Sequence, residues 1–130
     1  MSAATIQVAF PPAKDPDPKP IVQPENFLTA SGGEQVIWSI VTANAAVKGV
    51  EIEFGRRRDY FKGGGDSSTV IRKAFPKGEK KIVIVGEVPI LTAKDRTAVR
   101  FDKYTIRGLD RRGEVIPETE YDPVIVVDEP

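Results

Sequence analysis

One stretch of the chain, GRRRDYFKGGGDSS at residues 55–68, carries residue types that are typical of a binding site. Its basic and aromatic members are Arg56, Arg57, Arg58, Tyr60 and Lys62, which we take as candidate partner-binding residues. Guanidinium and ammonium groups attract anions, and aromatic rings between them suit stacking on a basic surface. A solvated connection between two strands is the simpler interpretation of the same stretch, since one of two adjacent aromatic residues usually turns into the core.

The balance of charge in the whole chain hides a local asymmetry. Lys plus Arg and Asp plus Glu each number 19, so the formal net charge is zero. Residues 56–81 nevertheless hold nine basic residues against three acidic ones, whereas residues 110–130 hold two against seven. We therefore expect an acidic protein or peptide as partner, with weak self-association through the acidic end as a second route. The neutral total argues against nucleic acid.

Several classes of chemistry are excluded by residues that the chain lacks. There is no cysteine and no histidine, and the one methionine is Met1. Disulfides, thiolate zinc sites, Ser–His triads and imidazole ligands are therefore all absent. The GGGD stretch at residues 63–66 lacks the lysine and the following helix of a phosphate-binding loop. We predict no catalytic residue, no metal and no cofactor, and hence a protein that is not an enzyme.

A group of carboxylates near the end of the chain is the remaining candidate for chemistry. Its members are Glu114, Glu118, Glu120 and Asp122. Calcium loops space their ligands around a turn that glycine makes possible, but here Val115, Ile116 and Pro117 interrupt the series. The pattern favours a solvated acidic loop.

The beginning of the chain, MSAATIQVAF, has no basic segment followed by an apolar run. No stretch approaches the roughly 18 apolar residues that cross a membrane. We therefore expect a cytoplasmic protein that has no membrane partner.

Alternation of apolar and polar residues predicts the elements that must position these groups. Residues 5–10 and 50–54 alternate with period two, as half-buried strands do. Residues 34–41, EQVIWSIV, are apolar on both faces, which indicates a central strand with Trp38 in the core. Further strands are expected at residues 70–75, 81–85, 99–107 and 124–128, and a short helix at residues 92–98.

Seven or eight short strands separated by turn residues predict an all-β fold, an antiparallel or mixed β-sandwich. At 130 residues the chain has the length of one domain, spanning residues 1–130. Residues 11–20, PPAKDPDPKP, hold five prolines and read as a Pro-rich connection.

Two segments carry a resemblance to a known family. They are PENFLTASGGEQVIWSI at residues 24–40 and FDKYTIRGLDRRGEVIPETEYDPVIVV at residues 101–127, with VEIEF between them. Together they resemble the cupredoxin-like sandwich, and more closely the copper-free bacterial proteins that share its strand plan. An immunoglobulin-like or fibronectin-like sandwich is the alternative, because it produces a similar string of strands.

The resemblance implies where copper ligands would lie. In copper-binding members a cysteine would fall near Ile106, and later ligands within residues 107–121. None of the required residue types is present. Because blue copper sites need thiolate and imidazole donors, the resemblance implies the fold without copper.

The function expected from these observations is a non-enzymatic binding or assembly module that meets an acidic partner through residues 56–62. The alternative is a sandwich that binds carbohydrate or another small ligand through an aromatic residue such as Tyr60, Tyr104 or Tyr121.

Overall fold

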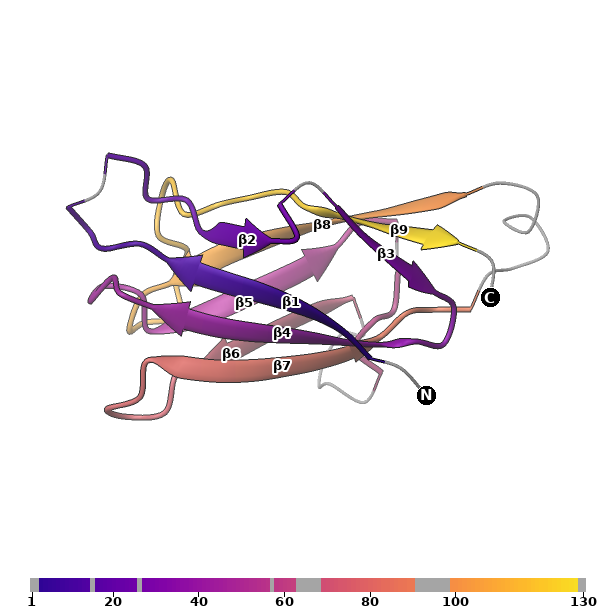
Figure 1. Ribbon diagram of the computed structural model, residues 1–130. Helices are drawn as coiled ribbons and strands as arrows, with labels where there is room; N and C mark the ends of the chain where they lie inside the picture. The colour runs from indigo at the N-terminus through magenta and orange to yellow at the C-terminus, as the bar shows by residue number, and fades with distance from the viewer. Residues whose placement is uncertain are drawn as a thin grey trace.

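In a computed structural model the chain forms two β-sheets that face each other (Figure 1). The structure describes residues 3–14, 16–25, 27–56, 58–62, 69–90 and 99–128. These residues form nine strands and no helix, so the all-β prediction is confirmed. The strands are β1 (Ala3–Phe10), β2 (Ile21–Gln23), β3 (Phe27–Ser31), β4 (Gln35–Thr42), β5 (Gly49–Phe54), β6 (Val70–Ala74), β7 (Lys81–Glu87), β8 (Arg100–Leu109) and β9 (Val124–Asp128).

Both sheets are mixed. The first has four strands in the order β2-β1-β4-β7, and the second has five in the order β3-β9-β8-β5-β6. Each contains one parallel pair, β1 with β4 and β3 with β9, and the other pairs are antiparallel. The predicted sandwich is thus correct, with one or two more strands than expected.

The core lies between the sheets and is centred on Trp38, as its position in the most apolar strand predicts. Trp38 is 0% exposed, and its indole Nε1 donates a hydrogen bond to the Tyr104 hydroxyl at 3.3 Å. The rings of Phe54, Tyr60 and Phe61 surround it, with centroids 5.6 to 6.5 Å from its own. Five aromatic rings, from both sheets and from the residues that follow β5, therefore form one cluster.

The outer face of the five-stranded sheet carries an ion-pair network. Glu51 faces outward, as the alternation of β5 predicts, yet it is only 4% exposed because Arg72 and Arg107 cover it. Arg107 also bonds Glu53 at 2.8 Å and Glu120 at 2.9 Å. Burial alone raises the pKa of Glu51, but the hydrogen bonds from both arginines outweigh it and hold that pKa below its ordinary value.

The register of β5 and β6 fixes which loops share an end of the sandwich. Glu53 pairs with Val70, and Gly49 pairs with Ala74. The loop that follows β5 therefore lies at one end, and the hairpin that follows β6 lies at the other. The Pro-rich connection links the antiparallel neighbours β1 and β2.

The short helix predicted at residues 92–98 falls outside the described residues. Among the residues that are described, no helix is long and apolar enough to span a membrane.

Candidate binding site

The described part of the basic stretch, residues 55–56 and 58–62, directly follows β5. The Gly55 amide bonds the carbonyl of Lys103 at 3.1 Å, and the Arg58 amide returns to the carbonyl of Gly55 at 3.2 Å. This turn places Arg56 at φ 54°, in the left-handed region. Arg56 and Lys62 are exposed and Arg58 is half-buried, whereas Arg57 lies outside the described residues.

Tyr60 is a correction to the predicted site, because the structure places it in the core. It is 1% exposed, and its ring stacks on Phe54 with centroids 3.8 Å apart. Its neighbour Phe61 is also buried, at 3% exposed. Both rings turn inward because the aromatic cluster around Trp38 accommodates both, so neither offers a stacking surface to a partner.

A buried carboxylate, Asp102 on β8, organises this end of the molecule. It is 1% exposed and accepts a hydrogen bond from the Tyr60 hydroxyl at 2.6 Å. Arg100 donates to both of its oxygens, from Nε and Nη2, at 2.8 Å each. Arg58 Nε lies 3.1 Å from Oδ1 without hydrogen-bond geometry, so it contributes charge only.

The sequence analysis missed Asp102 and Arg100, although a signal was available. In RFDKY, residues 100, 102 and 104 share the inward face of β8. A charge of each sign on the face that also carries a core tyrosine indicates a buried ion pair.

The same contacts fix the protonation of Tyr60. Burial is the largest cause that raises its pKa well above the ordinary value, and the hydrogen bond to Asp102 and the charge of that carboxylate add to it. The opposing effect of Arg100 is smaller. Tyr60 is thus a protonated donor to Asp102, not a nucleophile.

A pocket of about 720 Å³ opens beside this network. Its lining comes from the loop after β5 and from the start of β8, namely Gly55, Arg56, Arg58, Val99, Arg100, Phe101, Asp102 and Lys103. Four cationic residues therefore face one carboxylate. Two apolar side chains stand in solvent beside them, Phe101 at 59% and Val99 at 46% exposed. The pocket combines surplus positive charge with exposed apolar surface.

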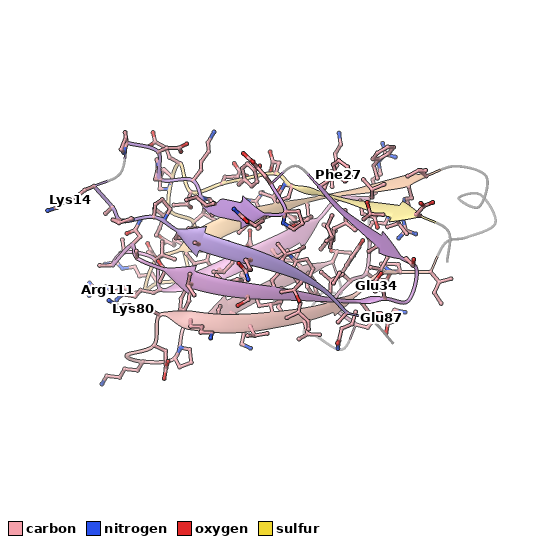
Figure 2. The ribbon with its side chains drawn as sticks, in the orientation of Figure 1. Lys14, Phe27, Glu34, Lys80, Glu87 and Arg111 are labelled. Atoms are coloured by element: carbon pink, nitrogen blue, oxygen red, sulfur yellow. The ribbon has the colours of Figure 1, made fainter. Side chains whose placement is uncertain are left out.

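The basic residues of the middle of the chain do not form one patch. Lys77, Lys80 and Lys81 lie at the end opposite the pocket, since Lys81 and Glu87 are the two ends of β7. Figure 2 shows Lys80 and Glu87 at opposite ends of the sandwich. The charge counted along residues 56–81 is thus divided between two separate surfaces.

The acidic segment and the tyrosines of the alternative hypothesis also have defined places. Glu120 pairs with Arg107, and Asp122 accepts a hydrogen bond from Thr105 at 2.8 Å. No group of three or more potential metal ligands gathers within the described ranges. Tyr104 is 2% exposed, so of the three tyrosines only the half-buried Tyr121 reaches solvent.

These observations define the protein's class as a two-sheet β-sandwich with mixed sheets. No known protein family matches the sequence, and no curated protein does. Among solved structures, the crystal structure of Lac15 from a marine microbial metagenome aligns with a TM-score of 0.46 and 10% sequence identity. The alignment covers 99% of this chain and 33% of the Lac15 chain, so this chain spans about a third of that protein's length.

Proposed function

We propose that this protein is a non-enzymatic binding module whose pocket at Arg56, Phe101 and Lys103 receives an acidic segment of a protein partner. The observation that carries the proposal is the surplus of positive charge beside exposed apolar side chains in one pocket.

The charges of the pocket are of two kinds. Arg100 is held by Asp102 and by the carbonyl of Pro89, which its Nη2 contacts at 2.9 Å. Arg56 and Lys103, in contrast, have no ion-pair partner in the part of the chain that the structure describes. They are the cations that a carboxylate from outside would meet.

The apolar side chains favour a protein partner over a small anion. Protein interfaces are enriched in phenylalanine and arginine, and their affinity comes from a few apolar anchors within a polar rim. Phe101 and Val99 would supply such anchors, with Arg56 and Lys103 on the rim.

The acid and base groups of the pocket support a role in binding rather than catalysis. Asp102 and the Tyr60 hydroxyl are bonded to each other, and Asp102 is also bonded to Arg100. Both groups are thus engaged within the protein, which favours a role in binding.

We further propose that the sandwich is of the copper-free cupredoxin-like kind. Immunoglobulin-type sandwiches are built from antiparallel sheets, whereas each sheet here contains a parallel pair. The lack of histidine and cysteine supports the absence of copper.

Fluorescence anisotropy with a labelled peptide of alternating Glu and Phe tests the binding proposal. The double variant Arg56→Ser/Lys103→Ser is expected to lose about tenfold in affinity, because two exposed charge pairs of up to about 1 kcal/mol each are removed. Phe101→Ser should weaken binding as well.

Two controls decide the result. The variant Arg111→Ser/Arg112→Ser removes the same charge from the opposite end and should bind the peptide as the wild type does. Equal binding of a peptide with Gln in place of Glu, or equal losses in both double variants, would rule out this pocket as the acidic-partner site.

A further inference from the structure

The end of the sandwich opposite the pocket is formed by three loops, at residues 43–48, 75–80 and 110–113. They carry five cations that we call the cationic end: Lys48, Lys77, Lys80, Arg111 and Arg112. Lys80, Arg111 and Lys14 all lie at this end of the sandwich (Figure 2).

Two adjoining hollows bring these side chains together. The first, of about 360 Å³, is lined by Lys48, Lys77 and Lys80. The second, of about 540 Å³, is lined by Lys48, Arg111 and Arg112, together with Arg72 and Lys73. Because Lys48 and Phe75 line both, the hollows form one continuous cationic surface.

The charges of the cationic end are not neutralised. None of its five side chains makes an ion pair or hydrogen bond with another residue of the described ranges. Elsewhere the fold pairs its arginines with carboxylates, as at Arg72, Arg100 and Arg107. The cationic end therefore keeps its full positive charge, as Arg56 and Lys103 do in the pocket.

The two acidic residues among these loops do not cancel that surplus. Asp110 caps its own turn, since its Oδ1 accepts the amides of Arg112 at 2.8 Å and of Glu114 at 3.0 Å. Glu79 is the one acidic residue among the described residues that line the first hollow, where it meets three lysines.

The turn that carries the two arginines is held in one geometry. The Asp110 amide bonds the carbonyl of Glu114 at 2.8 Å, and the Gly113 amide bonds the carbonyl of Asp110 at 3.0 Å. Gly113 has a φ of 78°, which glycine adopts without strain. The backbone of Arg111 and Arg112 is thus ordered before any ligand arrives, which lowers the entropy cost of binding.

The lining also indicates what kind of anion fits. Phe75 is half-buried, and neither hollow contains a large apolar side chain that stands in solvent. The anchors that an acidic protein segment would need, present as Phe101 and Val99 in the pocket, are missing here. An extended ligand that is held by charge alone matches this surface better.

We propose that the cationic end binds a chain of phosphate groups. Lysine and arginine are the residues that bind phosphate, lysine as a point charge and arginine through its paired N–H donors. Two adjoining hollows suit several phosphates in sequence rather than one. A nucleic-acid strand and inorganic polyphosphate share this chemistry, and the experiment distinguishes them. The site is separate in place and in ligand from the pocket proposed for an acidic partner.

Anisotropy of labelled oligothymidylate, and its competition by inorganic polyphosphate, tests the proposal over a range of salt concentrations. The double variant Arg111→Ser/Arg112→Ser should lose at least about tenfold in affinity at low salt. For the oligonucleotide, the slope of log affinity against log salt concentration should be smaller in magnitude for this variant than for the wild type by about 1.4. Each of the two phosphate contacts removed accounts for about 0.7 of that slope. Both side chains are exposed, so matched unfolding curves should show that the variant is folded.

The variant Arg56→Ser/Lys103→Ser is the control, since it removes two cations from the other end and should keep wild-type affinity. Binding that is tighter for one of the two phosphate chains than for the other supports the proposal. The chain that binds more tightly identifies the source of the phosphate groups. Three results would overturn it: no binding of either chain at low salt, equal losses in both double variants, or equally strong competition by poly-glutamate.

Discussion

Asp102 shows how one buried carboxylate joins the core to the surface of this protein. Its partners are a core phenol, Tyr60, and a buried guanidinium, Arg100. Burying a carboxylate is costly unless hydrogen bonds and an opposite charge compensate, and here both are present. The position of the loop after β5 is therefore coupled to the start of β8, where the pocket opens.

Replacing Tyr60 with Phe tests the strength of this coupling. The variant removes one hydrogen bond to a buried charge while keeping the ring, so the free energy of unfolding should fall by about 1.5–3 kcal/mol. Urea denaturation followed by Trp38 fluorescence measures the change. Tyr121→Phe is the matched control, because its hydroxyl bonds the carbonyl of Glu25 at 3.2 Å in an exposed position and should be nearly neutral. Equal effects of the two substitutions would contradict this account of Asp102.

At the scale of elements, β7 is the edge of the four-stranded sheet and carries exposed apolar residues. Val83 and Val85 are 42% and 48% exposed. Lys73, from β6 in the other sheet, donates from Nζ to the Val83 carbonyl at 3.0 Å. The Tyr60 carbonyl accepts the amide of Glu87 at 2.9 Å near the far end of the strand. Both contacts occupy edge groups that would otherwise pair with another chain.

Lys73→Ala should therefore promote self-association. It frees the Val83 carbonyl and removes a charge beside the exposed side chains of Val83 and Val85. Light scattering over a range of protein concentrations should show a rising mass for this variant. Lys77→Ala, which removes a lysine from the adjacent hairpin, should behave as the wild type. If Lys73→Ala and Lys77→Ala have the same mass at every concentration, the contact does not protect the edge.

Strands could be predicted from sequence where apolar residues either alternate with polar ones or occupy both faces. β5 was found because its buried and outward residues alternate, and β4 because both of its faces are apolar. β2 has only three residues, too few to show a period. The parallel pairing of β1 with β4 depends on contacts between distant segments, which no local pattern records.

The candidate site was predictable only in part, for a related reason. Arg56 and Lys62 stand out because cations are dense in that segment, and both are exposed as expected. Tyr60 was misplaced because sequence alone does not show whether the core has room for both adjacent rings. The cations counted over residues 56–81 lie at two opposite ends of the sandwich, because the chain reverses its direction between β5 and β6.

At the scale of the whole molecule, a single core joins both sheets, and two of the three tyrosines belong to it. Burial is the largest cause that raises the pKa of both Tyr60 and Tyr104 above the ordinary 10.0. For Tyr60 the hydrogen bond to Asp102 adds to this effect, whereas for Tyr104 the hydrogen bond from Trp38 opposes it. The folded protein therefore keeps both phenols protonated at a pH where an unfolded chain ionises them.

Stability should consequently decline at alkaline pH. Below the ordinary pKa the folded and the unfolded protein both hold these protons, so the stabilisation is complete. Above the ordinary pKa unfolding releases two protons, and the free energy of unfolding therefore falls as pH rises. Denaturation midpoints measured between about pH 8 and 11 test this. Tyr60→Phe should show a shallower decline, because one of the two protons is gone. The prediction would be refuted if tyrosinate absorbance showed both buried phenols ionising at a lower pH than the one at which the fluorescence change of unfolding occurs.

The order in which the strands are joined has a consequence for the protein's synthesis. β9 lies between β3 and β8, and among the described strands it is the one that pairs with β3. While the chain is being made, β3 is complete long before residues 124–128 exist, and β8 presents an unpaired edge beside it. The five-stranded sheet therefore cannot close until residues 124–128 have been made and have left the ribosome exit tunnel. Its folding must wait for this last strand, and the core stays incomplete until Ile125 and Val127 are inserted.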